Sequence, residues 1–170
     1  TPVDFTYNDL SIESIDRLTV LYPDLEDLYP LTPMQEGMLY HALAYDSPDV
    51  YFEQMSYRLQ GELDIKLVEK SANELLKRHA ILRTAFVYKD LERPLQVVLK
   101  DRTIDIYYED IRKRERKEVL IKEIKKKDTK RSFDLSKDEL IRLSVLRVED
   151  SEYELTWSFH HILMDGWCIG

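Results

Sequence analysis

Cysteine and glycine are scarce in this sequence of 170 residues, which contains one cysteine, Cys168, and four glycines. A single cysteine excludes an internal disulfide framework and a multi-cysteine metal site, and it suits a reducing compartment. The sequence also contains neither a P-loop, which holds phosphate groups, nor the Gly-x-Ser-x-Gly turn that presents a nucleophilic serine. We therefore expect a cytoplasmic protein without either of these two sites.

Long apolar runs are absent as well. No stretch approaches the roughly 18 consecutive apolar residues of a membrane span, and residues 1–4 have neither the basic nor the apolar part of a secretory signal. We therefore expect no membrane partner. The sequence starts with Thr1 instead of methionine and stops abruptly at Gly170, which indicates a piece of a longer polypeptide. Its length is sufficient to bury one core, so we expect one globular lobe.

The net charge of −8 argues against nucleic acid as a partner, but the charges are unevenly distributed. Residues 1–30 carry seven acids and one arginine, whereas residues 112–131 carry eleven Lys or Arg and four acids. The basic stretch is typical of an amphipathic helix with a thin apolar stripe. Two interpretations remain open, a solvated helix face and a docking surface for an acidic partner. Charge reversal at Lys125, Lys126 and Lys127 distinguishes them.

Two helices are predicted by their start signals. Residues 33–44 should form a helix, because Thr32 can act as N-cap, Pro33 suits the first helical position, and Gln35 can complete a capping box. Asp64 is expected to cap a second helix, whose apolar residues recur at four-residue intervals.

Strands are expected at residues 51–59, 81–88, 95–99, 104–108, 141–148 and 153–160. In the last of these, aromatic and apolar residues alternate with polar ones, so the strand has two different faces. Hairpins beside long crossover helices favour an α/β two-layer sandwich, in which helices cover a mixed sheet (an α+β arrangement).

The stretch HHILMDGW at residues 160–167 follows the last strand and is the main candidate for a functional site. By alternation, His161 continues the aromatic face and lies where the buried side chains end. A neutral imidazole accepts a proton near pH 7, and a glycine allows backbone N–H groups to approach a substrate. The pattern alone fits a general base and equally a pair of ordinary pocket-lining histidines. Metal binding is less attractive, because His160 and His161 point to opposite sides and no third ligand lies at zinc-site spacing.

Three stretches together resemble one family. Residues 160–167 resemble the HHxxxDGW signature of condensation domains in nonribosomal peptide synthetases. LTPMQEGML at residues 31–39 resembles the first core motif of these domains, and RHAILRTAF at residues 78–86 resembles the second. The start of the chain is similar to linkers that follow an upstream carrier domain.

This resemblance implies a chloramphenicol-acetyltransferase-like fold of two lobes, with the active site in a tunnel between them. Residues 1–27 would be a linker from an upstream carrier domain, and residues 28–170 the N-terminal lobe, with the C-terminal lobe absent. The implied reaction joins a carrier-bound acyl or peptidyl thioester to a carrier-bound amine. The substrates would be presented on 4'-phosphopantetheine arms by upstream donor and downstream acceptor carrier domains, and no cofactor would bind directly.

The resemblance also implies roles for the motif residues. His161 matches the active-site histidine, which either takes a proton from the attacking ammonium or holds the amine in line. The backbone N–H of Gly166 is expected near the tetrahedral oxyanion, and His160 is expected to support the site. Trp167 directly follows the glycine, whereas epimerisation domains usually place a Val-Ser-Trp run there, which favours condensation.

Asp165 is expected to pair with an arginine of the second motif and thereby fix the histidine loop. We assign Arg78 as its partner, with Arg83 as the alternative. Because breaking a buried pair costs about 3–5 kcal/mol, Asp165→Ala should destabilise the fold more than His161→Ala. Two other functions remain open, half of an epimerisation domain and a non-catalytic fragment that binds carriers. The lobe alone is expected to be inactive.

Overall fold

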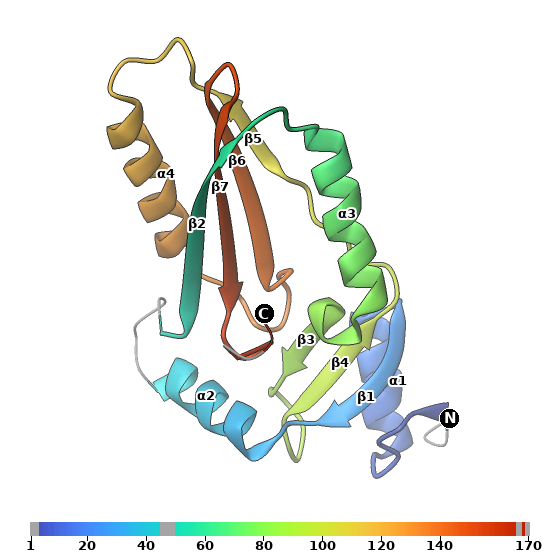
Figure 1. Ribbon diagram of the computed structural model, residues 1–170. Coiled ribbons are helices and arrows are strands. Elements are labelled where there is room, and N and C mark those ends of the chain that lie inside the picture. Colours follow the sequence, from blue (N-terminus) through green and yellow to red (C-terminus); the bar gives the residue numbers. More distant parts are fainter. Residues whose placement is uncertain (1–3, 45–49, 166–167, 169–170) are drawn as a thin grey trace.

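The computed structural model describes residues 4–44, 50–165 and 168, which form two β-sheets and the helices around them (Figure 1). The larger sheet has the strand order β2-β7-β6-β5, and the smaller one the order β1-β4-β3. All neighbouring strands are antiparallel except β5 and β6, which are parallel. The strands are β1 (Leu25–Pro30), β2 (Phe52–Gln60), β3 (Thr84–Val87), β4 (Leu95–Leu99), β5 (Tyr107–Asp110), β6 (Ile141–Glu149) and β7 (Glu152–His160).

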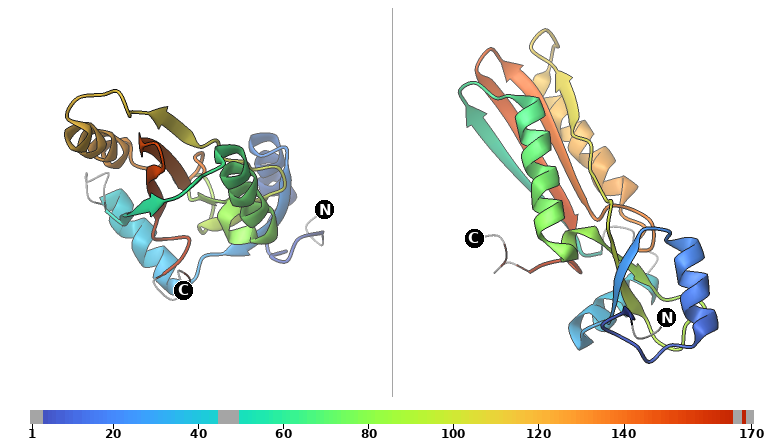
Figure 2. Two further views of the ribbon diagram at one scale, coloured as in Figure 1. Left: turned by 45° about the horizontal axis from the view of Figure 1, so that its top comes forward. Right: turned by 90° about the vertical axis from the view of Figure 1, so that its right-hand side faces the viewer.

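Helices cover both faces of the larger sheet (Figure 2). Leu76 of α3 is buried in one cluster with Phe159 of β7, and on the opposite face Ile121 of α4 is buried with Leu146 of β6. The expected mixed sheet covered by helices is therefore confirmed, and the structure adds a second small sheet. The helices are α1 (Ile12–Leu21), α2 (Pro33–Ala44), α3 (Ile65–Arg78), the short 3-10 helix η2 (Ala80–Arg83) and α4 (Lys117–Arg131).

The start of the chain packs onto the smaller sheet. Leu18 of α1 is buried in a cluster with Leu28 of β1 and Val97 of β4. The backbone N–H and the hydroxyl of Thr6 both donate to the carboxylate of Asp27, at 2.7 Å each. Although partial burial opposes the effect, these hydrogen bonds hold the pKa of Asp27 below its ordinary value. The residues before β1 are thus attached to the smaller sheet at both α1 and Thr6.

The helix starts follow the predicted signals. In the capping box of α2, Gln35 Oε1 accepts from the N–H of Thr32 at 2.9 Å, and the N–H of Gln35 donates to Thr32 Oγ1 at 3.3 Å. The carboxylate of Asp64 accepts from the N–H of Leu67 at 3.1 Å and caps α3. Both predicted caps are confirmed.

Two predicted strands start later than expected, and in each case a side-chain hydrogen bond explains the difference. The segment expected at 81–88 begins as the 3-10 helix η2, in which Thr84 Oγ1 donates to Ala80 O at 2.9 Å. The segment expected at 104–108 joins the sheet only at Tyr107. The reason is that Asn73 of α3 binds both the N–H and the carbonyl of Ile104, at 2.9 Å each. Side chains of α3 thus replace the neighbouring strand as hydrogen-bond partners.

No helix in the described part of the chain is long and apolar enough to span a membrane.

Candidate functional site

The histidine pair lies where β7 leaves the larger sheet, and the two neighbouring segments hold its backbone. The N–H of His160 donates to Leu140 O at 3.0 Å, just before β6. The N–H of His161 donates to Tyr51 O at 2.8 Å, just before β2. The chain then turns, with the N–H of Leu163 donating to His160 O at 3.1 Å. The positions of both histidines are therefore fixed by hydrogen bonds to either side of β7.

His160 is a buried, neutral residue with only 3% of its surface exposed. Its ring lies near Phe133 in an edge-on arrangement, with 6.5 Å between the ring centroids. The N–H of Ile162 donates to Nδ1 at 3.2 Å, so this nitrogen carries no proton. Burial, and to a smaller extent the charge of His161, lowers the pKa of His160 to about 4. His160 is therefore an acceptor that shapes the loop.

Acidification should destabilise the chain through His160. Because its pKa is lower in the folded chain than the ordinary 6.5, the unfolded chain binds more protons between about pH 6.5 and pH 4, and stability falls as the pH falls through this range. The full effect is about 3 kcal/mol. Urea unfolding of the chain and of His160→Asn at pH 7 and pH 4.5 should show a loss that is about 2–3 kcal/mol smaller in the variant. The same loss in both would contradict this environment of His160.

His161 has a more open position than His160. Its side chain is half-buried, and its ring stacks on that of Tyr51, with 6.5 Å between the centroids and 14° between the planes. Asp165 is exposed, and its backbone carbonyl accepts from the N–H of Cys168 at 3.1 Å. Gly166 and Trp167 lie outside the described residues.

The two candidate arginines have very different environments. Arg83 is buried, and its Nη1 donates to Glu26 Oε2 at 2.6 Å and to Leu99 O. Its Nε donates to Leu76 O at 3.0 Å. Arg83 therefore ties the end of α3 to β1 and β4, whereas Arg78, in the last turn of α3, is exposed.

The stability argument for Asp165 has to be corrected. The prediction assumed a buried ion pair, but the side chains of Asp165 and Arg78 are both exposed in this chain. An exposed pair contributes only about 0–1 kcal/mol, because water screens both charges. The strong destabilisation expected for Asp165→Ala therefore does not follow, and the assignment of Arg78 stays a prediction.

Two hollows of the described surface are lined by residues other than His160 and His161. One hollow of about 600 Å³ lies beside α1 and is lined by residues such as Tyr22 and Tyr88. Another of about 580 Å³ lies beside α4, over Arg142 and Ser158. Among the described residues, no three His, Cys, Asp or Glu side chains come together as metal ligands.

The comparison with known families decides the identity of this arrangement. The family model of the condensation domain matches residues 25–170. This chain belongs to the condensation domain family.

Curated relatives of this condensation domain chain are much longer synthases. Bacitracin synthase 3 of Bacillus licheniformis is 39% identical over 173 residues, which cover 100% of the chain and 3% of that protein. Tyrocidine synthase 2 of Brevibacillus parabrevis is 44% identical over 147 residues, which cover 85% of the chain and 4% of that protein. The chain thus spans less than a tenth of the length of these relatives.

Solved structures agree on the fold. The starter condensation domain of rhizomide synthetase has a TM-score of 0.76 at 18% identity, with 84% of this chain and 34% of that chain covered. The tallysomycin biosynthesis protein TlmII has a TM-score of 0.69 at 23% identity, with 82% and 35% covered. The predicted fold class is therefore confirmed.

Sequence reasoning missed Tyr51 as a residue of the candidate site. Tyr51 has a positive φ of 64°, an uncommon conformation for a residue with a side chain, and it provides both the acceptor and the ring that contact His161. The signal lies in the strand pairing, because Phe52 pairs with His160 and thereby places Tyr51 opposite His161.

Gln35 also forms hydrogen bonds outside α2, which its role in the capping box did not predict. Besides closing the capping box, its Nε2 donates to Gln96 Oε1 of β4 at 3.1 Å and to Ile162 O at 3.3 Å. The first core motif of this condensation domain thus contacts the histidine motif directly, through one side-chain amide.

Proposed function

We propose that this chain is the N-terminal lobe of a condensation domain that forms amide bonds. The amine of a carrier-bound aminoacyl group attacks the carbonyl carbon of a carrier-bound acyl or peptidyl thioester. A C–N bond forms, the C–S bond breaks, and the proton lost by the amine balances the one taken up by the leaving thiolate. The substrates arrive on the 4'-phosphopantetheine arms of an upstream donor and a downstream acceptor carrier domain, in the cytoplasm.

The observation that carries this proposal is the difference between the two histidines. His160 is buried and neutral, and its Nδ1 is committed to the N–H of Ile162. His161 is half-buried at the end of β7, with one ring face on Tyr51. One imidazole is thus held by the fold and the other remains accessible to a substrate. His161 then takes a proton from the amine nitrogen as this nitrogen attacks, or it holds the amine in line.

The remaining motif residues complete the proposed site. The backbone N–H of Gly166 stabilises the oxyanion of the tetrahedral intermediate, and Asp165 pairs with Arg78 to hold the loop. Trp167 directly after the glycine supports condensation over epimerisation. These assignments are supported by the match of the motif to the family.

We further propose that residues 1–27 connect the lobe to an upstream carrier domain and that a second lobe completes the tunnel. The chain covers only 34% of the rhizomide synthetase domain, which supports the need for a second lobe. Exposed apolar side chains on α1, such as Ile12, Val20 and Leu21, support contact with a further domain. The lobe alone should then be inactive.

An amide-formation assay with loaded carrier proteins tests this function. The chain alone and the continuous two-lobe protein are each mixed with an acyl-loaded donor carrier and an aminoacyl-loaded acceptor carrier, and the acceptor is analysed by intact-protein mass spectrometry. We expect the condensed product only with the two-lobe protein. Product from the chain alone would contradict the need for the second lobe. In a parallel assay of the stereochemistry of the carrier-bound residue, inversion of its α-carbon without amide formation would instead identify an epimerisation domain.

A further inference from the structure

We propose that the outer face of α4 is a docking surface for an acidic α-helix of a partner protein. We call this surface the lysine stripe and define it by Lys122, Lys126 and Lys130, which are all exposed. It lies on the helix that covers the face of the larger sheet opposite α3 (Figure 2), so it is separate from the amide-forming chemistry proposed above.

The inner face of α4 uses some of its charges to hold the helix on the sheet. Lys125 donates to Glu154, a buried residue of β7. Asp128 accepts from Ser158 Oγ at 2.6 Å, and its Oδ1 lies 2.8 Å from Nε of Arg142. Lys125, which the sequence grouped with Lys126 and Lys127, therefore faces inward and does not belong to the docking surface.

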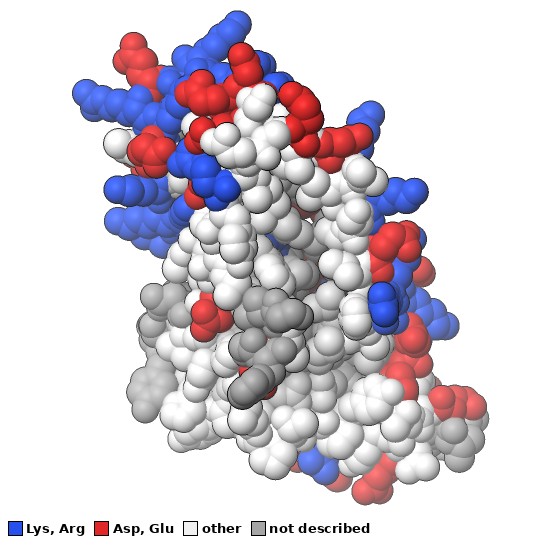
Figure 3. Space-filling model, viewed as in Figure 1, with Lys and Arg blue, Asp and Glu red and all other residues white. Residues whose placement is uncertain are grey.

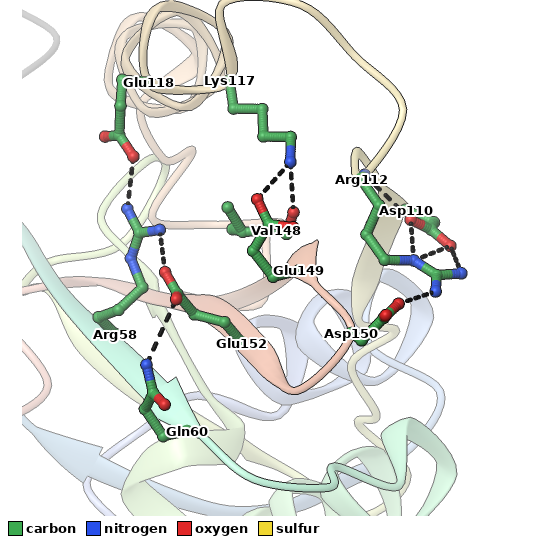
Figure 4. A network of polar contacts seen from close by, with 10 residues as sticks. All are labelled: Arg58, Gln60, Asp110, Arg112, Lys117, Glu118, Val148, Glu149, Asp150 and Glu152. Carbon is green, nitrogen blue, oxygen red and sulfur yellow. Dashed lines mark hydrogen bonds and ion pairs between the residues drawn. The ribbon is translucent and has the colours of Figure 1, made fainter.

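The charged side chains at the start of α4 also form ion pairs and hydrogen bonds within the chain (Figure 4). Lys117 donates to Val148 O at 2.9 Å and to the carboxylate of Glu149. Glu118 pairs with Nη2 of Arg58 at 2.8 Å. This end of the helix is therefore close to electrically neutral.

What remains on the outside of α4 is strongly positive. Six exposed charged residues of the helix, five cations and one acid, form no ion pair within the described part of the chain: Lys122, Lys126, Lys127, Lys130, Arg131 and Glu123. Figure 3 shows these basic side chains gathered on the side of the molecule where α4 lies. Two of the three acids of the helix, Glu118 and Asp128, pair with arginines of the larger sheet. The outer face therefore has a higher proportion of basic residues than the helix as a whole.

The like charges on this outer face lower the stability of α4. Lys122 and Lys126, and again Lys126 and Lys130, are spaced four residues apart, and like charges at this spacing repel each other and destabilise a helix. No acid of the described chain lies within ion-pair distance of these three lysines. A partner with the opposite charge would remove this repulsion.

The spacing of the stripe favours a helix as that partner. With a rise of about 1.5 Å per residue, the three lysines are separated by about 6 Å steps along one line. An antiparallel helix with Glu or Asp at i, i+4 and i+8 places carboxylates at the same steps. Val119 is 51% exposed one turn before Lys122 and provides an apolar contact.

Binding of a synthetic helical peptide with glutamate at i, i+4 and i+8 tests the proposal. Fluorescence anisotropy should give an affinity that weakens about ten-fold or more in Lys126→Glu/Lys130→Glu. The matched control is Lys66→Glu/Lys70→Glu, which changes the same charge at the same spacing on exposed positions of α3 and should change the affinity less than about two-fold. Raising NaCl from about 50 to about 500 mM should also weaken binding about ten-fold or more. Circular dichroism melts confirm that both variants remain folded.

Three results would overturn the proposal. Equal weakening by the α3 control would show that only net charge matters. Equal binding of a peptide with the same glutamates at scrambled spacing would show that the partner need not present a helical stripe. Tighter binding of a short DNA duplex or of phosphatidylserine vesicles, lost in the same α4 variant, would assign the surface to a different class of partner.

Discussion

Replacing Arg83 by alanine should lower the free energy of unfolding by about 2–4 kcal/mol. The substitution leaves the carbonyls of Leu76 and Leu99 without their buried donor, and each unsatisfied acceptor costs about 1–3 kcal/mol. Glu26 contributes less, because its side chain is 43% exposed and water can solvate it once the arginine is gone. Urea unfolding at pH 7 measures the loss.

Arg78→Ala is the matched control for this result. It removes the same side chain five positions away, but from the exposed last turn of α3. The free energy of unfolding should change by less than about 0.5 kcal/mol. If the two variants were equally stable, Arg83 would not be the residue that joins α3 to the smaller sheet.

His161→Ala should lower kcat for amide formation by the continuous two-lobe protein about 10²- to 10⁴-fold, the range typical of a lost proton-transfer group. Its melting temperature should change little, because the ring is half-buried and the fold holds His161 through its backbone N–H. Single-turnover product formation on the acceptor carrier measures the rate.

His41→Ala is the control for the catalytic variant, since His41 is exposed in the last turn of α2 and lies outside the three motifs; it should leave kcat unchanged. An unchanged kcat in His161→Ala would remove this residue from the proposed reaction. A loss of activity that merely follows a lower melting temperature would assign it a structural role instead.

Local signals predicted the parts of the fold that depend on neighbouring residues. The capping box of Thr32 and Gln35 and the cap at Asp64 involve groups within three positions of each other, and both are confirmed. The alternation of β7 is also local. Phe159 is buried with α3, whereas Ser158 bonds to Asp128 of α4.

Features that depend on distant partners could not be predicted in this way. The late start of β5 results from Asn73, which lies 31 positions before the Ile104 backbone that it binds. The partner of Arg83 is Glu26, which lies 57 positions away on β1. Periodicity carries no information about such pairs. The family resemblance identified the second motif as functional, but it did not distinguish a buried structural arginine from an exposed one.

The side-chain amide of Gln35 has a consequence for the order in which the site forms during synthesis. Its Nε2 joins α2 to Gln96, 61 positions later, and to Ile162, 127 positions later. The second bond cannot form until the ribosome has delivered the last residues of β7 and the turn after it. Long-range contacts of this kind form late in folding, because the chain must first lose the entropy of the intervening loop. The histidine loop therefore acquires its final geometry only after Ile162 has left the ribosome.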